Sequence, residues 1–172
     1  NDGLASNPGV GIVSVAARAS LGAAFLSFGS ATSSLLVADF AAANFTRFDS
    51  RAGRDRAGTI QIEGGTFQIG DGPQSDIDTG ASRFNGMLRG ASGYFIKGGA
   101  GDAELASDAS DFAGDVVIQG GRLIVAPGAL KNSILSIVSE GTLAAPLATL
   151  DTPLQIGALN GTFYLPVADM TV

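Results

Sequence analysis

Acidic side chains are the residues of this sequence best able to do chemistry, and they gather in two stretches. Asp71, Asp76 and Asp78 stand among glycine, proline and serine in a turn-rich segment, and carboxylate oxygens in such a loop are ligands that Ca²⁺ prefers. The second set is Asp102, Glu104, Asp108 and Asp111. A solvated loop explains both sets more simply. Ca²⁺ at the first set is therefore the one cofactor that the sequence leaves open, and no other cofactor is predicted.

Four arginines form a basic cluster: Arg47, Arg51, Arg54 and Arg56. Phe45 and Phe48 lie among them in the sequence. Guanidinium groups bind phosphates and carboxylates through paired hydrogen bonds, so the cluster is a candidate patch for an anionic partner such as a phosphate or an acidic glycan. The charged edge of a loop, with Asp49 and Asp55 as neighbours, is the simpler explanation of the same residues.

The residue types that the chain lacks exclude most catalytic machinery. It has no histidine and no cysteine, so it cannot form a histidine-based hydrolytic triad, a structural zinc site or a disulfide. Paired carboxylates could still cleave glycosides, as in polysaccharide-degrading β-helices. Such sites usually add aromatic platforms for sugar rings, whereas this chain has no tryptophan and two tyrosines. We therefore predict a non-enzyme without catalytic residues; the alternative is a carbohydrate-active or toxin-bearing fragment.

Length and charge narrow the class of protein. The chain has 172 residues and a formal net charge of −6, with 45% hydrophobic and 15% charged residues. This length suits one domain, and the acidic balance argues against a nucleic-acid partner, because such binding depends on neutralised phosphates. The apolar stretch from Val10 to Phe40 contains Arg18 and frequent glycine and serine, so it is not predicted to be a transmembrane segment. No basic region precedes it, and we expect a mature or excised segment whose targeting sequences lie outside it.

Short strands joined at glycines are the elements predicted to position these residues. In residues 58–70, isoleucine and phenylalanine alternate with threonine and glutamine on both sides of Gly64-Gly65, which predicts two strands. The same design returns in residues 114–126, with its hinge at Gly120-Gly121. A Gly-polar-apolar triplet also recurs at intervals of about 20 residues: Gly65-Thr66-Phe67, Gly86-Met87-Leu88, Gly121-Arg122-Leu123, Gly141-Thr142-Leu143 and Gly161-Thr162-Phe163.

A period near 20 residues with β-type alternation predicts an all-β fold, a parallel β-helix or β-solenoid with about 20 residues per turn. About eight turns, stacked at about 4.8 Å, would make a rod on the order of 40 Å long, and the 25 glycines would serve its corners. The predicted inward side chains are Ile60, Ile62, Phe67, Ile69, Val116, Ile118, Leu123, Val125, Leu135, Ile137 and Leu143. An antiparallel sandwich also has short strands and glycine turns, but it does not explain the recurrent spacing.

Residues 84–125 carry three further elements in a fixed order. These are Phe-Ile-Lys-Gly-Gly-Ala-Gly at 95–101, Phe-Ala-Gly at 112–114, and a strand containing Gly-Gly-Arg-Leu within 116–125. Together they resemble the passenger-associated repeat of bacterial autotransporters, with Gly98 where that repeat usually has threonine or serine. The resemblance is close over about 42 residues and extends more loosely from 58 to 163.

The resemblance implies a right-handed parallel β-helix that is exported through the envelope of a Gram-negative bacterium to the cell surface or the outside. It implies a repeat-bearing region at 58–172 and leaves 1–57 as an apolar N-terminal segment, either a cap or the first irregular rungs. The repeat has no catalytic residues of its own, so the expected function is structural or adhesive, toward a host or a neighbouring cell.

The ends of a solenoid suggest a second kind of partner. Terminal rungs expose unpaired strand edges and need a cap. If residues 1–40 dock on the next molecule instead of capping their own, the chain assembles head to tail into a filament. Self-association through the solenoid ends is therefore predicted beside contact with a cell surface.

Overall fold

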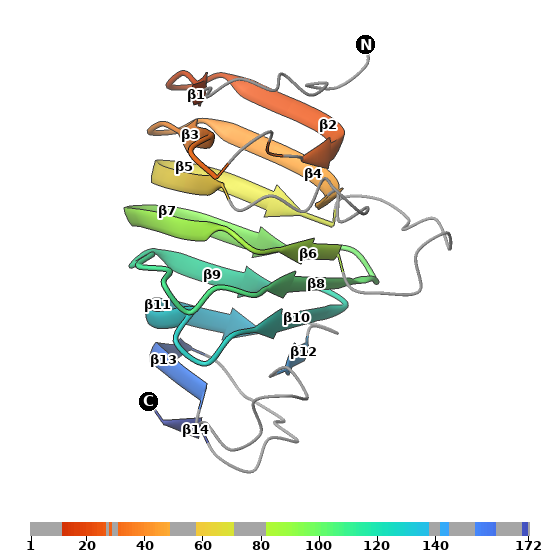
Figure 1. Ribbon diagram of the computed structural model, residues 1–172, viewed down its shortest axis with the longest axis vertical. Coiled ribbons are helices and arrows are strands. Elements are labelled where there is room, and N and C mark those ends of the chain that lie inside the picture. The colour runs from red at the N-terminus through yellow and green to blue at the C-terminus, as the bar shows by residue number, and fades with distance from the viewer. Residues whose placement is uncertain are drawn as a thin grey trace.

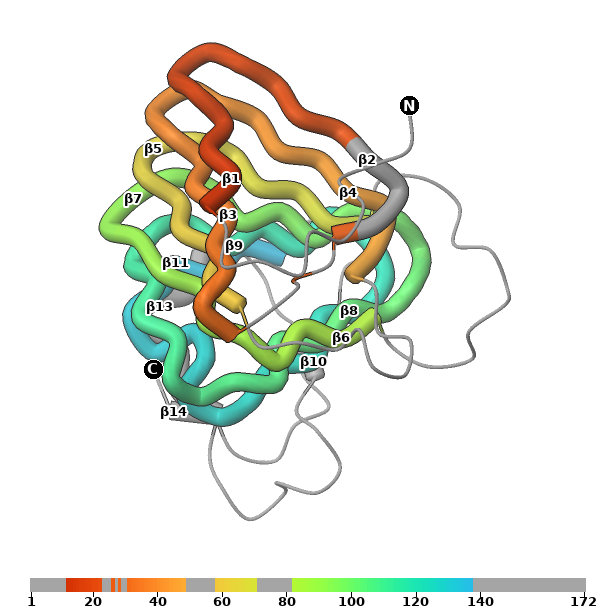
Figure 2. Tube along the Cα trace, turned by 45° about the horizontal axis from the view of Figure 1, so that its top comes forward, coloured from red at the N-terminus to blue at the C-terminus, as the bar shows by residue number. Residues whose placement is uncertain are grey.

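A computed structural model describes residues 12–26, 28, 31–48, 58–70, 82–137, 142–144, 154–160 and 170–171. Their strands run parallel and stack as a β-solenoid with roughly 22 residues per turn. Figure 1 shows the strands stacked along the long axis of the molecule, and Figure 2 shows the chain coiling from rung to rung. The predicted all-β parallel β-helix is confirmed. Within these residues there is no helix with the length and apolar character needed to cross a membrane.

Strand pairing divides the coil into three sets of strands, which we call its faces. The first face holds β1 (Ile12–Val15), β3 (Ser34–Val37) and the beginnings of β5 (Thr59–Ile69) and β7 (Met87–Lys97). The second face holds β2 (Ser20–Leu26), β4 (Ala42–Phe48), the ends of β5 and β7, β9 (Asp115–Ile118), β11 (Leu130–Ile137) and β13 (Leu154–Asn160). The third face holds β6 (Ser82–Phe84), β8 (Asp102–Leu105), β10 (Arg122–Val125) and β12 (Thr142–Ala144). A short strand, β14 (Met170–Thr171), pairs with the start of β13.

Side chains form columns because the strands of each face pair in register. On the first face, Leu35 pairs with Ile60, which pairs with Leu88. One column of the second face contains Phe67, Phe95, Val116 and Leu135. Each inner rung thus hydrogen-bonds to the rungs on both sides of it, which satisfies its backbone along the coil.

The core fills the coil with these inward columns. Nine of the eleven predicted inward side chains are at most 1% exposed: Ile60, Ile62, Phe67, Ile69, Val116, Ile118, Leu123, Val125 and Leu135. Ile137 packs against this core and is partly buried, and the side chain of Leu143 lies outside the described residues. Phe67 packs between Phe45, whose ring is tilted against it, and Phe95, whose ring stacks on it, with each pair of ring centroids 5.7 Å apart. Such ring pairs contribute about 0.5–1.5 kcal/mol each beyond simple burial.

Glycine is required where one corner column brings backbones together. Gly65, Gly93 and Gly114 stand two residues before Phe67, Phe95 and Val116, which share a column, so these glycines stack as well. A Cβ on Gly93 would lie 2.5 Å from the carbonyl oxygen of Gly65, and one on Gly114 would lie 2.5 Å from that of Gly93. Gly93 also has a φ of +101°, which side-chain-bearing residues avoid. The predicted role of glycine at the corners is confirmed here.

The repeat units deduced from the glycine triplets do not all superpose on the coil. Met87 and Leu88 pair with Thr59 and Ile60, so the triplets that begin at 65 and 86 lie on different faces. Residues 115–118 likewise continue the columns of 66–69 rather than those of 59–62, which they match in sequence. The predicted spacing does hold between 122–124 and 142–144, which pair directly with each other.

The turns are not of equal length, and early turns exceed the 20-residue spacing expected from the glycine triplets. Ser34 pairs with Thr59, and Thr59 pairs with Met87. Both of these steps along the chain are longer than the later step from Arg122 to Thr142. A solenoid turn can lengthen in a loop without changing the strands that stack. The spacing of the later triplets therefore underestimates the mean turn length.

Residues 12–48 form rungs of the same coil. β1 pairs with β3 and β2 pairs with β4, and Ser34 and Ala42 join these strands to β5 at Thr59 and Thr66. Whether residues 1–11 form the predicted cap is a question that lies outside the described residues.

Buried serines join rungs where regular strand pairing stops. The backbone N–H of Phe48 donates to Ser82 Oγ, and that of Leu88 donates to Ser110 Oγ at 3.1 Å. Ser133 Oγ donates to the carbonyl of Phe112 at 2.8 Å. Every buried side-chain nitrogen or oxygen that the structure describes has a hydrogen-bond partner, which is the condition for burying polar groups at low cost.

Candidate functional site

Most predicted site residues fall outside the described part of the chain. This applies to the candidate Ca²⁺ ligands Asp71, Asp76 and Asp78, and to Arg51, Arg54 and Arg56 of the basic cluster. Arg47 is described; it lies on β4 and is partly buried. Phe45 and Phe48 belong to the core, with exposures of 0% and 2%. These two rings are therefore not part of an arginine and phenylalanine surface.

The second acidic set is dispersed among arginine partners. On the third face, Asp102 pairs with Arg122 of the next rung, and Glu104 lies 3.3 Å from Arg83 of the preceding rung. Across the described ranges, no three acidic residues gather where they could hold a metal ion. The arginine partners are about half exposed, and ion pairs of this kind contribute about 0–1 kcal/mol each.

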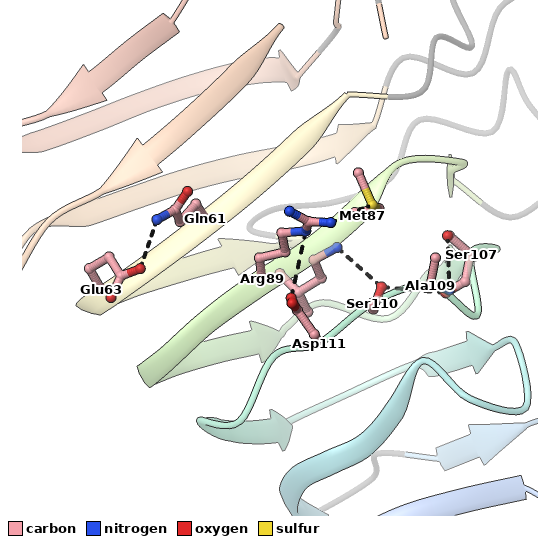
Figure 3. Close-up of polar contacts among 9 residues, drawn as sticks. Gln61, Glu63, Met87, Arg89, Ser107, Ala109, Ser110 and Asp111 are labelled. Carbon is pink, nitrogen blue, oxygen red and sulfur yellow. Dashed lines mark hydrogen bonds and ion pairs between the residues drawn. The ribbon is translucent and has the colours of Figure 1, made fainter. Parts of the chain in front are cut away.

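A third ion pair lies on the outer side of the first face. Arg89 Nε is 3.7 Å from Asp111 Oδ1, and Arg89 Nη2 also contacts the sulfur of Met87 at 3.2 Å. Figure 3 shows this group beside the side-chain bond from Gln61 to Glu63, which is 2.8 Å long. The outer side of this face thus carries charges that are largely satisfied by their own neighbours.

Lys97 is the one charged side chain among the buried residues that the structure describes. Alternation along β7 places it inward with Phe95, and it pairs with Ile69 of the rung before and Ile118 of the rung after. Its exposure is only 1%. A lysine therefore stands in a column whose neighbouring members are isoleucines.

The Lys97 ammonium group is held by three backbone carbonyls at the corner that follows β7. Nζ donates to Gly98 O, to Gly99 O at 3.1 Å, and to Gly120 O of the next rung at 3.1 Å. Burial lowers the pKa of Lys97 from 10.5 to about 8, while the negative charge of Asp102 acts in the opposite direction. We call this group the Lys97 corner: it crosslinks two rungs through a tethered cation.

A second unusual corner lies between the first and second faces of the first two rungs. Arg18 and Phe40 have φ angles of 62° and 56°, and they lie at the corner where the next rung has Gly64, whose φ is 79°. The Phe40 ring is 71% exposed, and Arg18 Cζ lies 6.0 Å from its centroid. The left-handed backbone costs a side-chain-bearing residue about 1–2 kcal/mol. Phe40 does not recover that cost by burial.

The outer side of the second face carries a column of a different kind. Tyr94, Asp115 and Ile134 follow one another on β7, β9 and β11. Tyr94 is 47% exposed and Ile134 is 42% exposed. An aromatic ring, a carboxylate and an aliphatic side chain are thus presented on neighbouring strands, and a ligand that lies across the rungs could contact all three.

Sequence reasoning missed the Lys97 corner and the Phe40 corner. The signal for Lys97 was present, because strict alternation from Phe95 places it on the buried side. The signal for Phe40 emerges only from its place at the corner where the next rung has Gly64, which depends on how the rungs stack.

No protein-family model matches this chain, and neither the curated proteins nor the solved structures contain a significant match. The resemblance to the passenger-associated repeat therefore stays a prediction from sequence.

Proposed function

We propose that this chain is a non-catalytic structural or adhesive module of an autotransporter-like protein. In this proposal it acts outside the cell or at the outer-membrane surface, and it associates with other copies through an end of its coil. The proposal of location rests on the elements at 95–101 and 112–114 that resemble the passenger-associated repeat.

The observation that carries the proposal is the uninterrupted parallel stacking of β1, β3, β5, β7, β9 and β11 along the coil. The inward-pointing side chains of each strand pack in the core, so only the outward-pointing side chains and the two ends of the coil can contact a partner. A rigid coil that displays long faces is suited to holding surfaces at fixed spacing.

Tyr94 and Ile134 make the second face the better adhesive surface among the described residues. On the third face, the charged side chains Arg83, Glu104 and Arg122 already have partners within the sheet. The Tyr94 column has exposed aromatic and aliphatic groups, which contribute strongly to contact with a partner.

The experiment has two arms. In the native host, antibody labelling and protease treatment of intact cells should detect the chain at the surface. Beads coated with the purified chain should bind a panel of cells, matrix proteins and glycans, and the double change Tyr94→Ser with Ile134→Ser should lower the bound fraction at least threefold. Arg122→Ser, on the third face, is the matched control and should bind like the wild type.

Two results would overturn the proposal. Retention of the chain inside intact cells would remove the surface location. Hydrolysis of any polysaccharide by the purified chain would replace an adhesive module with the carbohydrate-active alternative.

A further inference from the structure

One inward column of the core is open at the first described rung, since Val13 is accessible there while Val15 of the same strand is buried. Val13 stands in the inward column with Leu35 and Ile60, and the exposures along this column are 36%, 1% and 0%. On the outward side of the same strand, Ile12 is 75% exposed. β1 is also an edge strand of its sheet, because β3 is its one partner strand among the described residues. An apolar column thus ends at an accessible strand edge.

Within β1 itself, the described residues supply none of the side-chain or bulge protections against pairing. Its four residues, Ile-Val-Ser-Val, carry no charge and no proline, and they pair with β3 without a bulge. Exposed edges that stay unpaired normally carry lysine, proline or a bulge, because a free row of N–H and C=O groups is a template for another strand. This edge is therefore suited to receive a strand.

We propose that the occupant is the β1 edge of a second copy, paired antiparallel about a two-fold axis. The alternation of β1 makes it complementary to itself. With Ser14 opposite Ser14 of the second copy, Val13 of each copy lies opposite Val15 of the other, and all four valines point inward. The open Val13 column of each copy then ends against Val15 of the other copy.

The symmetric contact uses one surface twice, so it closes as a dimer. A head-to-tail contact would use two different surfaces and would continue as a filament. All the features that favour association here lie on β1, and the symmetric contact requires nothing further. This inference rests on the proposed self-association and specifies the contact that makes it.

The absence of cysteine makes the contact directly testable by single-cysteine crosslinking. In the Ser14→Cys variant, mild oxidation should convert most of the chain to a disulfide-linked dimer, because residue 14 faces itself across the axis. Ser92→Cys, at an exposed position on β7, is the matched control and should stay uncrosslinked. Light scattering after size exclusion should give twice the chain mass of 17.2 kDa.

A charge on the edge should weaken the dimer without disturbing the core. Ile12→Lys places two lysines near the axis at an outward position, and it should raise the dissociation constant at least tenfold with an unchanged circular dichroism spectrum. A wild-type chain that stays monomeric at all concentrations overturns the inference, as does a growing polymer without Ser14→Cys crosslinks. Surface display and bead binding test the rest of the proposed function separately. A displayed, adhesive monomer overturns this inference and the proposed self-association but leaves the adhesive surface role. An intracellular dimer overturns only the surface role.

Discussion

Raising the pH from 7 to 9.5 should stabilise this protein through Lys97. Burial lowers the pKa of Lys97 from 10.5 to about 8, and Asp102 opposes part of that effect. Between these two pH values the unfolded chain keeps the lysine proton that the folded chain has released. The free energy of unfolding therefore rises as the pH rises from about 8 to 10.5, since the unfolded state binds more protons in that range.

The size of the effect follows from the two pKa values. Each unit of difference between the folded and unfolded pKa values corresponds to about 1.36 kcal/mol of unfolding free energy. Titration from pH 7 to 9.5 realises a little over half of the full free-energy difference between the two states, which amounts to about 2 kcal/mol. The neutral amine keeps two of its three donors, so most bonds to Gly98, Gly99 and Gly120 survive deprotonation.

The assay compares urea unfolding at the two pH values, followed by circular dichroism, in three proteins. The wild type should gain about 2 kcal/mol more than Lys97→Met over this pH interval, because methionine fills the site without titrating. The chain has one other lysine, Lys131, which is exposed, and Lys131→Met should keep the wild-type response. Changes in the overall negative charge affect all three proteins alike and cancel in the comparison.

Nuclear magnetic resonance of lysine side chains gives an independent reading of the same pKa. In Lys131→Met a single lysine remains, and its Cε signal should titrate near pH 8. A midpoint near the ordinary lysine value would refute the account of the Lys97 corner. Equal pH responses in wild type and Lys97→Met would refute it as well.

Two further predictions concern the corners. Gly114→Ala should lower the free energy of unfolding, measured in urea, by more than about 2 kcal/mol, because the new Cβ would lie 2.5 Å from the Gly93 carbonyl oxygen. Gly22→Ala is the control: its nearest contact is at 3.8 Å, and it should change the free energy of unfolding by less than about 0.5 kcal/mol. Equal effects of the two substitutions would contradict the close approach at Gly114. Phe40→Gly should have a free energy of unfolding about 0.5–1 kcal/mol higher than Phe40→Ala in the same assay, because alanine keeps the backbone strain of a φ of 56° and glycine removes it. Equal stability of the two variants would contradict the strain.

The inward side chains could be predicted because they depend on local alternation alone. A strand that alternates over four residues buries every second one, whichever strand lies beside it. Phe67 and Ile118 were therefore placed inward from sequence, and both are buried. The same rule places Lys97 inward, but lysine is so rarely buried that alternation alone did not decide its position.

The stacking of rungs could not be predicted from the spacing of motifs, because loops change the length of a turn without changing the strands. Residues 59–62 and 115–118 are alike in sequence, yet they lie on different faces. What sets the register is which apolar columns meet, and this depends on the whole coil. The candidate segments at 71–78 and 51–56 lie outside the described residues, and neither has the alternation from which a strand can be predicted.

Three features of the coil share one physical origin, which is a column or corner in which a single residue departs from its neighbours. Lys97 stands between two isoleucines, Phe40 stands where the next rung has Gly64, and Val13 has no strand above it among the described residues. In a solenoid, each rung repeats the environment of the rung below, so a residue that suits its column adds stability and little else. A residue that breaks its column carries a cost in charge burial, backbone strain or exposed apolar surface. These three departures are therefore places to look for function beside the outward column of Tyr94, Asp115 and Ile134, because the regular inward columns are already accounted for by packing.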